Sequence, residues 1–374
     1  MRTNSTRLLC LYLVLATPLA VNAHERNDAL EEIVVTGRQQ VLAGEARSAS
    51  EGLIGQVNIA TRPLLRPGDV LEAVPGLIVT QHSGSGKSNQ MFLRGFNLDH
   101  GTDFATWVDG MPVNMRTHGH GQGYTDINFL IPETIESMAY VKGPYHAELG
   151  DFSSAGGVQI STFNQLPLRI TLGLGEDGYT RLLGMGSAQV ASSLSLSAAL
   201  EGQTYDGPWT DINEDVEKIN GLVRLSGGDD VYNWSTTAMY YDNTWNSADQ
   251  IPTRAVASGL IDELGSIDPT LGGSSRRSSL SGELSHEHDD HRSEWRGYLI
   301  DYDMNLWSNF TYQLEDPENG DQFEQVDDRT IVGGAYHRYW VGGAREHFHH
   351  SLGATFRHDD INTVGLYRYR HGGM

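Results

Sequence analysis

Cysteine and long apolar runs are scarce in this chain, and both shortages limit how it can fold. The 374 residues hold one cysteine, Cys10, which lies inside an N-terminal apolar segment. Disulfides and thiolate metal sites therefore cannot hold the remainder together. Beyond that segment no run of about 18 apolar residues occurs, so the sequence predicts no transmembrane helix. If the chain crosses a membrane, it must do so with the strands of a closed β-barrel.

Basic residues and catalytic motifs are also in short supply. Lys and Arg number 26 against 48 Asp and Glu, which gives a formal net charge of −22 at pH 7. A chain this acidic does not attract nucleic acid through its overall field. Neither a G-x-S-x-G nucleophile elbow nor an H-E-x-x-H metal motif occurs. We therefore predict that the chain is not an enzyme.

One segment matches only part of a nucleotide-binding motif. Gly86-Lys87-Ser88 ends like a phosphate-binding loop, but that motif also needs a glycine at position 81, where this chain has Gln81. The residues from Met91 onward have the pattern of a strand, whereas the motif must open a helix. We therefore expect no nucleotide site.

Residues 1–23 have the three parts of an export signal. Arg2 and Arg7 supply the positive start, and residues 8–19 form an apolar core too short to span a bilayer. Val21-Asn22-Ala23 then places small residues where a signal peptidase needs them. The alternative is an N-terminal anchor helix. Removing the segment would take away two arginines and no acidic residue, so the net charge would become −22 − 2 = −24.

The stretch from Met91 to Thr162 is the most informative part of the chain. Each of its five motifs is a short apolar strand closed by a Gly or Pro turn, which predicts a compact, turn-rich β domain. The motifs are Phe92-Leu93-Arg94-Gly95-Phe96, Trp107-Val108-Asp109-Gly110-Met111-Pro112-Val113, Ile135-Glu136-Ser137, Lys142-Gly143-Pro144 and Ala155-Gly156-Gly157-Val158-Gln159-Ile160-Ser161-Thr162.

In their order and in their residues, these motifs resemble the plug of TonB-dependent outer-membrane receptors. The resemblance implies a mainly β fold, with an N-terminal α+β plug domain inside a transmembrane antiparallel β-barrel. It also implies energised uptake of a scarce ligand, such as a siderophore or a metal chelate, across the outer membrane of a Gram-negative bacterium. The ligand itself stays open, because the loops that choose it vary within one fold.

A second short segment resembles the TonB box of this family. Glu31-Glu32-Ile33-Val34-Val35-Thr36-Gly37 contains a β-branched run that can add as a strand to the sheet edge of a partner, which would be TonB. The alternative is an ordinary first strand. The seven residues before it leave no room for the extra signalling domain that some receptors carry.

We divide the chain into a signal peptide (1–23), a periplasmic tail with the TonB box (24–44), a plug (45–165) and the N-terminal part of a barrel (166–374). Beyond residue 165, period-2 alternation dominates, as in Leu194, Leu196, Ala198 and Leu200 between serines. Short connections near 227–230, 287–291 and 341–346 alternate with long ones near 203–220, 246–275 and 306–325. Periplasmic turns and extracellular loops alternate in this way. A soluble β-sandwich shares the strand pattern but not usually the segregated loop lengths.

The barrel part is shorter than the resemblance requires. Receptors of this family close about 22 strands around the plug. After residue 165 there remain 374 − 165 = 209 residues, enough for roughly ten or eleven such strands. An open half-barrel would leave unpaired edges in lipid. We therefore expect the sequence to be the front half of a longer receptor.

Three plug loops of the family rise toward the outside and contact ligand. They correspond here to residues 81–89, 97–103 and 114–124. For the whole receptor, the resemblance implies three partners: TonB, outer-membrane lipid and a small transported ligand. Three histidines in this region are candidate ligands of Zn, Ni, Cu or a chelated metal; polar packing of the plug against barrel loops is the alternative. No resident cofactor is required. The candidate ligand contacts are His82, Asn97, Asp99, His100, Arg116, His118, His120, Gln122 and Tyr124, of which His100, His118 and His120 are the candidate metal ligands.

Two further predictions concern charged residues. Arg94 and Lys142 stand where the family's plug carries basic residues that pair with barrel carboxylates, so we expect them to hold the plug in place. His286-Glu287-His288-Asp289-Asp290-His291 resembles a metal site, but it falls on a short connection and we interpret it as a solvated turn.

The predicted function is TonB-dependent transport. Two alternatives stay open: a truncated receptor fragment that binds ligand without transporting it, and a metal-binding surface protein.

Overall fold

The computed structural model describes residues 44–64, 66–81, 85–247, 249–288, 290–309, 312, 321–342 and 348–368. The proposed export signal and the segment Glu31–Gly37 lie outside the described residues. The chain divides into two units, Met1–Thr36 and Gly37–Met374, and everything below concerns the second. Among the described residues no helix is long and apolar enough to cross a bilayer.

The first part of this unit is a small α+β domain, here called the N-terminal domain. Its larger sheet is antiparallel except for one parallel pair, β6 with β9. The strand order in this sheet is β1 (Glu45–Ala46), β2 (Glu51–Gly55), β8 (Ile135–Val141), β9 (Gly156–Thr162), β6 (Phe104–Val108) and β7 (Met111–Pro112).

A second sheet and four short helices complete the N-terminal domain. The sheet contains β3 (Leu77–Thr80), β4 (Gln90–Leu93) and β5 (Phe96–Asn97), and the helices are α2 (Gln56–Ala60), η1 (Pro67–Ala73), η2 (Pro132–Thr134) and η3 (Ala147–Leu149). Apolar residues of both sheets and of η1 are fully buried in one cluster, among them Val70, Leu93, Phe104, Val108 and Met138. Their burial excludes water from the domain's centre and is the main force that holds it together.

The turn between β6 and β7 follows directly from its sequence. Asp109 and Gly110 both have positive φ, 47° and 76°. This is the pair that a two-residue hairpin turn of type I′ requires, and Asp-Gly is one of its preferred sequences. The turn places the Asp109 carboxylate where it reaches both Thr162 of β9 and Arg224 of the sheet described next.

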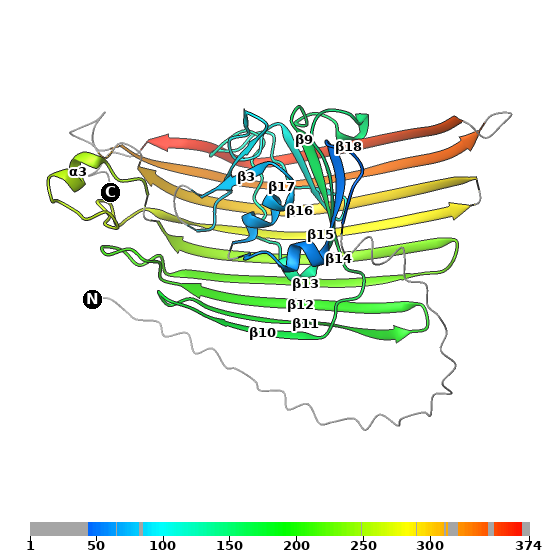
Figure 1. The fold of residues 1–374 in the computed structure, drawn as a ribbon, viewed down its shortest axis with the longest axis horizontal. Coiled ribbons are helices and arrows are strands. Elements are labelled where there is room, and N and C mark those ends of the chain that lie inside the picture. Colours follow the sequence, from blue (N-terminus) through cyan, green and yellow to red (C-terminus); the bar gives the residue numbers. More distant parts are fainter. Residues whose placement is uncertain are drawn as a thin grey trace, which may run out of the picture. The chain divides into compact units, whose positions relative to one another are not determined.

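The second part is a nine-stranded antiparallel sheet, here called the large sheet. Each strand pairs with the next one along the chain, so the spatial order equals the sequence order (Figure 1). The strands are β10 (Arg169–Leu174), β11 (Thr180–Ala191), β12 (Leu194–Tyr205), β13 (Val216–Gly228), β14 (Tyr232–Asn246), β15 (Gly272–His288), β16 (His291–Asn309), β17 (Gln322–Gly342) and β18 (Phe348–Arg368). A short helix, α3 (Thr253–Ala257), lies in one connection.

The two faces of the large sheet differ in chemistry. In β13 the buried positions include Lys218, Asn220 and Arg224, while Ile219 and Val223 between them are exposed. Buried polar and exposed apolar side chains thus alternate with the period of two that the sequence predicts. The polar face is the one that contacts the N-terminal domain.

The connections differ in length at the two ends of the large sheet. At one end, two to five residues separate β11 from β12, β13 from β14, β15 from β16 and β17 from β18. At the other end, 10 to 25 residues separate β12 from β13, β14 from β15 and β16 from β17. This matches the predicted alternation. The two ends are called below the short-turn end and the long-loop end.

Candidate functional site

The loop of residues 114–124, here called the histidine loop, is fixed at its base. Met115 and Tyr124 form an antiparallel bridge across it, with the Met115 amide donating to the Tyr124 carbonyl at 2.9 Å. The Asn114 amide nitrogen donates to the carbonyl oxygens of Gly101 (2.7 Å) and Phe104 (2.9 Å). The buried Asn114 side chain therefore ties the histidine loop to the neighbouring loop of residues 97–103.

His118 is packed between the N-terminal domain and the large sheet. Its ring stacks on that of Tyr124, with centroids 3.8 Å apart and planes within 3°. Its Nε2 lies 3.4 Å from the Tyr302 hydroxyl and 3.8 Å from Oδ2 of Asp327. Burial lowers the pKa of His118 well below its usual value, and the positive charge of Arg329 lowers it further. The ring is therefore neutral near pH 7, which leaves a nitrogen able to accept a hydrogen bond or bind a metal.

His100 and His120 lie beside each other, with ring centroids 4.2 Å apart. His100 Nδ1 is 2.9 Å from the Ser88 carbonyl, and His120 Nδ1 is hydrogen-bonded to the Gln325 side chain. The sequence thus predicts correctly that His100, His118 and His120 gather in one place. Among the described residues, however, their ligand nitrogens do not all come within 4.8 Å of one another. In this arrangement the Nδ1 of His100 donates to the Ser88 carbonyl, and the Nδ1 of His118 accepts from the backbone amide of His120 at 3.0 Å.

Two arginines of the large sheet hold the backbone of the histidine loop. Arg329 of β17 donates to the Thr117 carbonyl at 2.5 Å and also bonds Asp327, while Arg357 of β18 donates to the Asn114 carbonyl at 2.7 Å. Gly119 completes the contact, because a Cβ there would lie 2.6 Å from the carbonyl oxygen of Gly365. Only a glycine lets the loop approach the sheet this closely.

The other predicted ligand contacts divide by exposure. Asn97, Arg116 and Gln122 are exposed and Asp99 is partly exposed, so these four are accessible to a ligand. Arg116 pairs with Asp151 at 2.7 Å. Tyr124 is fully buried and donates its hydroxyl toward Met304 Sδ at 3.5 Å. His82 lies outside the described residues.

A second anchor joins the turn at Asp109 to the large sheet. Arg224 Nη2 of β13 lies 2.6 Å from Oδ2 of Asp109, and the two side chains are only 3% and 6% exposed. The same carboxylate accepts hydrogen bonds from the amide and hydroxyl of Thr162, at 2.9 and 2.7 Å. Arg224 also donates to the carbonyl of Thr162 at 2.8 Å and to the hydroxyl of Thr237 at 2.7 Å. The pair is therefore fully hydrogen-bonded although it is buried, as a stable buried pair must be.

A third anchor is built around Glu133 of η2. Arg181 of β11 forms two parallel hydrogen bonds with its carboxylate, at 2.7 and 2.8 Å. Arg181 also contacts Glu201 of β12, whose carboxylate lies 2.9 Å from Lys218 Nζ of β13. Charges of alternating sign thus run from the N-terminal domain across three strands of the large sheet.

Arg94 and Lys142 make different contacts from those predicted. Arg94 donates to the carbonyls of Lys142 (2.9 Å) and Ala49 (3.3 Å), and Lys142 Nζ donates to the Pro75 carbonyl at 3.2 Å. These partners lie within the N-terminal domain. Among the described residues the ion pairs to the large sheet come instead from Asp109 and Glu133. Among the described residues both side chains therefore brace the domain through carbonyls, and their pairing with barrel carboxylates stays a prediction.

Two buried charges lie next to the histidine loop. Burial lowers the pKa of Lys87 to about 8, against an opposing effect of Asp249, and its Nζ has no hydrogen-bond partner among the described residues. Burial also raises the pKa of Asp126 to about 6, although Asn128 donates its backbone amide to it at 2.8 Å. In their ionised forms both groups lower the stability of the folded state, because burial disfavours a charged side chain.

With this geometry in place, the chain can be compared with known proteins. Residues 45–158 match the family model of the TonB-dependent receptor plug domain. The chain carries a TonB-dependent receptor plug domain. The N-terminal domain described above is that plug domain, and the predicted resemblance is confirmed.

Solved structures share the fold of this chain over most of its length. The ferric yersiniabactin uptake receptor FyuA from Yersinia pestis is 15% identical, with a TM-score of 0.65 over 84% of this chain and 50% of that one. The copper transporter OprC is 18% identical, with a TM-score of 0.60 over 88% and 50%. The ferric-catecholate import receptor Fiu from E. coli K12 is 14% identical, with a TM-score of 0.60 over 88% and 53%. At these identities the likeness concerns the fold, and this chain spans about half the length of each of these proteins.

Proposed function

We propose that this chain forms the plug and the first barrel strands of an outer-membrane receptor that takes up iron or another metal as a chelate, driven by TonB. The observation that carries the proposal is the plug domain, ion-paired to the polar face of a long antiparallel sheet. Buried pairs such as Asp109–Arg224 hold a separate domain against that face. A removable plug inside a pore needs such an arrangement, because polar contacts can be exchanged for water when it moves.

The other face of the large sheet supports a lipid environment. Leu200, Ile219, Val223, Leu280 and Leu299, which lie on four different strands, are all exposed, by 47–63%. Apolar side chains on the outer face, opposite a polar inner face, are typical of transmembrane β-strands. In this proposal the short-turn end faces the periplasm and the long-loop end faces the medium.

The ligand would meet the plug near the histidine loop. Asn97, Arg116 and Gln122 are accessible there, and Arg116 suits an anionic chelate because a guanidinium binds carboxylates bidentately. A ligand that favours a rearranged histidine loop would shift the plug toward that conformation. Since Arg329 and Arg357 hold this loop on β17 and β18, its rearrangement would loosen the plug from the sheet.

The proposed energy source is TonB, acting through residues 31–37. Their β-branched run would add as a strand to TonB in the periplasm. Pulling on this segment would then move a plug that ligand has already loosened. This segment remains a prediction from the sequence.

Uptake by whole cells tests the proposal. Cells that depend on this receptor would be given radioactive ferric citrate, a ferric catecholate and Cu²⁺ in turn. We expect uptake of at least one probe, and we expect its loss, with surface binding retained, when residues 31–37 are replaced by seven Gly and Ser residues.

The matched control replaces residues 24–30, also seven in number, in the same way and should leave uptake intact. Binding without uptake in the unaltered receptor would favour the non-transporting alternative. Uptake that survives replacement of residues 31–37 would contradict TonB-dependent transport by this segment.

A further inference from the structure

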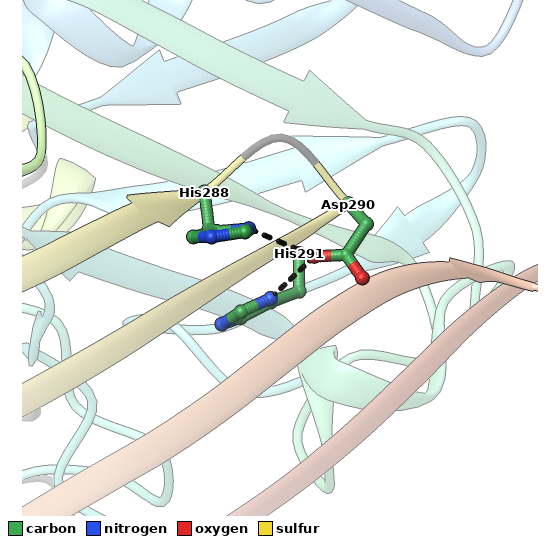
Figure 2. Close-up of side chains that lie close together, drawn as sticks. All are labelled: His288, Asp290 and His291. Carbon is green, nitrogen blue, oxygen red and sulfur yellow. Dashed lines mark hydrogen bonds and ion pairs between the residues drawn. The ribbon is translucent and has the colours of Figure 1, made fainter.

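A second group of histidines lies at the short-turn end, on the connection between β15 and β16. His288 ends β15, His291 begins β16, and Asp290 lies in the turn between them (Figure 2). Among the described residues this is the one place where three side chains of metal-binding type bring a ligand atom each within 4.8 Å of one another. The sequence interpretation of a solvated turn did not foresee this convergence.

The spacing of the three ligand atoms suits a single ion. His288 Nδ1 and His291 Nδ1 lie 3.0 and 2.8 Å from the same Asp290 oxygen, Oδ1. In a tetrahedral zinc site with bonds of about 2.0–2.1 Å, neighbouring ligand atoms are roughly 3.3 Å apart. Lengthening both contacts to Asp290 by a few tenths of an ångström would bring them to this spacing.

The backbone around the turn is held by the connection between β13 and β14 on one side and by β17 on the other. The Glu287 amide donates to the Val231 carbonyl at 2.8 Å, and the Val341 amide donates to the Asp290 carbonyl at 3.1 Å. His288 and His291 are directly paired across the two strands, so their side chains leave the same face. Strand ends position ligands more precisely than a free loop does.

The side chains remain open to solvent, which sets the kind of site. His288 and Asp290 are 58% and 72% exposed, and His291 is 20% exposed. His286, two residues before His288 and on the same face of β15, has its ring 5.6 Å from that of His291. Three protein ligands with an open position are typical of exchangeable transition-metal sites.

We propose that His288, Asp290 and His291 bind a divalent transition-metal ion of the Zn²⁺, Ni²⁺ or Cu²⁺ class at the short-turn end of the sheet. Two imidazole nitrogens and one carboxylate oxygen form a donor set that suits these ions better than Ca²⁺ or Mg²⁺, which prefer oxygen ligands alone. The site is separate from the histidine loop, and it does not depend on whether the chain transports anything.

The test is a titration of the purified full chain in detergent with Zn²⁺, after treatment with a chelator. The unaltered protein is compared with His288→Ala/His291→Ala and with His146→Ala/His358→Ala, which removes two other histidines. We expect the first double variant to lose one equivalent of bound Zn²⁺, or to bind it more than about tenfold more weakly, because even loss of an outer partner costs roughly 10–100-fold. The control pair should bind as the unaltered protein does.

A single variant, Asp290→Asn, keeps both imidazoles and tests the carboxylate alone. It should weaken Zn²⁺ binding by roughly 10–100-fold. The proposal is overturned if both His288→Ala/His291→Ala and Asp290→Asn bind Zn²⁺ as tightly as the unaltered protein does. It is also overturned if the control pair loses as much binding, because scattered histidines would then account for the metal. If the double variant does not fold, the Asp290→Asn result decides.

Discussion

Replacing Arg224 by Met tests how the plug domain is held. The substitution keeps much of the side-chain length but leaves the Asp109 carboxylate without its ionic partner in a site where both groups are less than 10% exposed. Removing one partner of a buried pair typically costs roughly 3–5 kcal/mol, because the other charge stays buried and unpaired. Asp109 keeps its two hydrogen bonds from Thr162, so the lower part of that range is expected.

Hydrogen exchange of the plug strands is the assay that measures this loss locally. Peptides covering β6 (Phe104–Val108) and β9 (Gly156–Thr162) contain or adjoin the residues that the pair contacts. If these strands exchange when the plug leaves the sheet, a loss of about 3 kcal/mol should speed their exchange by roughly 100-fold, at about 1.4 kcal/mol per tenfold. Strands β15 and β16 provide an internal reference within the same molecule.

A matched variant shows whether the effect belongs to the buried pair. Arg292 forms a pair with Glu294 at 2.8 Å, but Arg292 is 53% exposed, so Arg292→Met should cost no more than about 1 kcal/mol. The double variant Asp109→Asn/Arg224→Met removes both charges and should recover most of the loss, because Asn tolerates the positive φ of this turn and its side-chain oxygen can still accept from Thr162. Equal exchange in Arg224→Met and Arg292→Met would refute the reasoning.

Three further predictions concern the region of the histidine loop. Lys87→Met should stabilise the protein by up to about 3 kcal/mol at pH 7, because the pKa of Lys87 falls from 10.5 to about 8 on folding and each unit corresponds to about 1.4 kcal/mol. The resulting rise in the thermal midpoint should fade as the pH increases from about 8 to 10.5. An unchanged thermal midpoint at pH 7 would contradict this prediction. For Asp126 the folded pKa is raised from 3.8 to about 6, so stability should fall by about 3 kcal/mol as the pH rises between these values; Asp126→Asn should lack this slope in thermal melts, and an unchanged slope would show that other groups cause it. His118→Ala/His120→Ala should weaken binding of Zn²⁺ or Ni²⁺ at the histidine loop, as titration would show, and unchanged binding would reject these rings as ligands.

The architecture could be read from the sequence because its signals are local. The Asp109-Gly110 turn, the alternation in β12 to β16 and the lengths of the connections each depend on a few neighbouring residues, and each appears in the structure. Alternation also showed which residues share a face. It did not show which face contacts the plug, because polar and apolar faces are both present in a soluble sandwich and in a membrane strand.

The contacts between plug and sheet could not be predicted in the same way. Arg224 and Asp109 are separated by 115 positions in the sequence (224 − 109), and Arg329 reaches Thr117 across 212. Nothing local pairs such residues. A partial signal was present, since Lys218, Asn220 and Arg224 alternate with the period of a strand and share one face of β13 with the buried Leu222. Charged residues on a buried face need hydrogen-bonding or ionic partners. The histidines of the loop were found because they cluster in sequence, but their packing against Asp327 and Gln325 depends on β17.

The same distinction explains the two histidine groups. From the sequence, His100 and the two histidines of the histidine loop were candidate metal ligands, with polar packing as the alternative, and the short connection was interpreted as a solvated turn. In the structure His100, His118 and His120 lie close together, but each ring has a different partner, Ser88, Tyr302 and Gln325 respectively. His288 and His291, in contrast, both contact Asp290. Spacing along the chain indicates which ligands can meet, whereas strand pairing decides which of them do.

The most direct test of TonB-dependent action is binding of the periplasmic domain of TonB to the purified full chain. It needs no knowledge of the transported ligand. The account predicts saturable binding that is lost when residues 31–37 are replaced by Gly and Ser and kept when residues 24–30 are replaced instead. Equal binding of TonB to all three proteins, or to none, would contradict it.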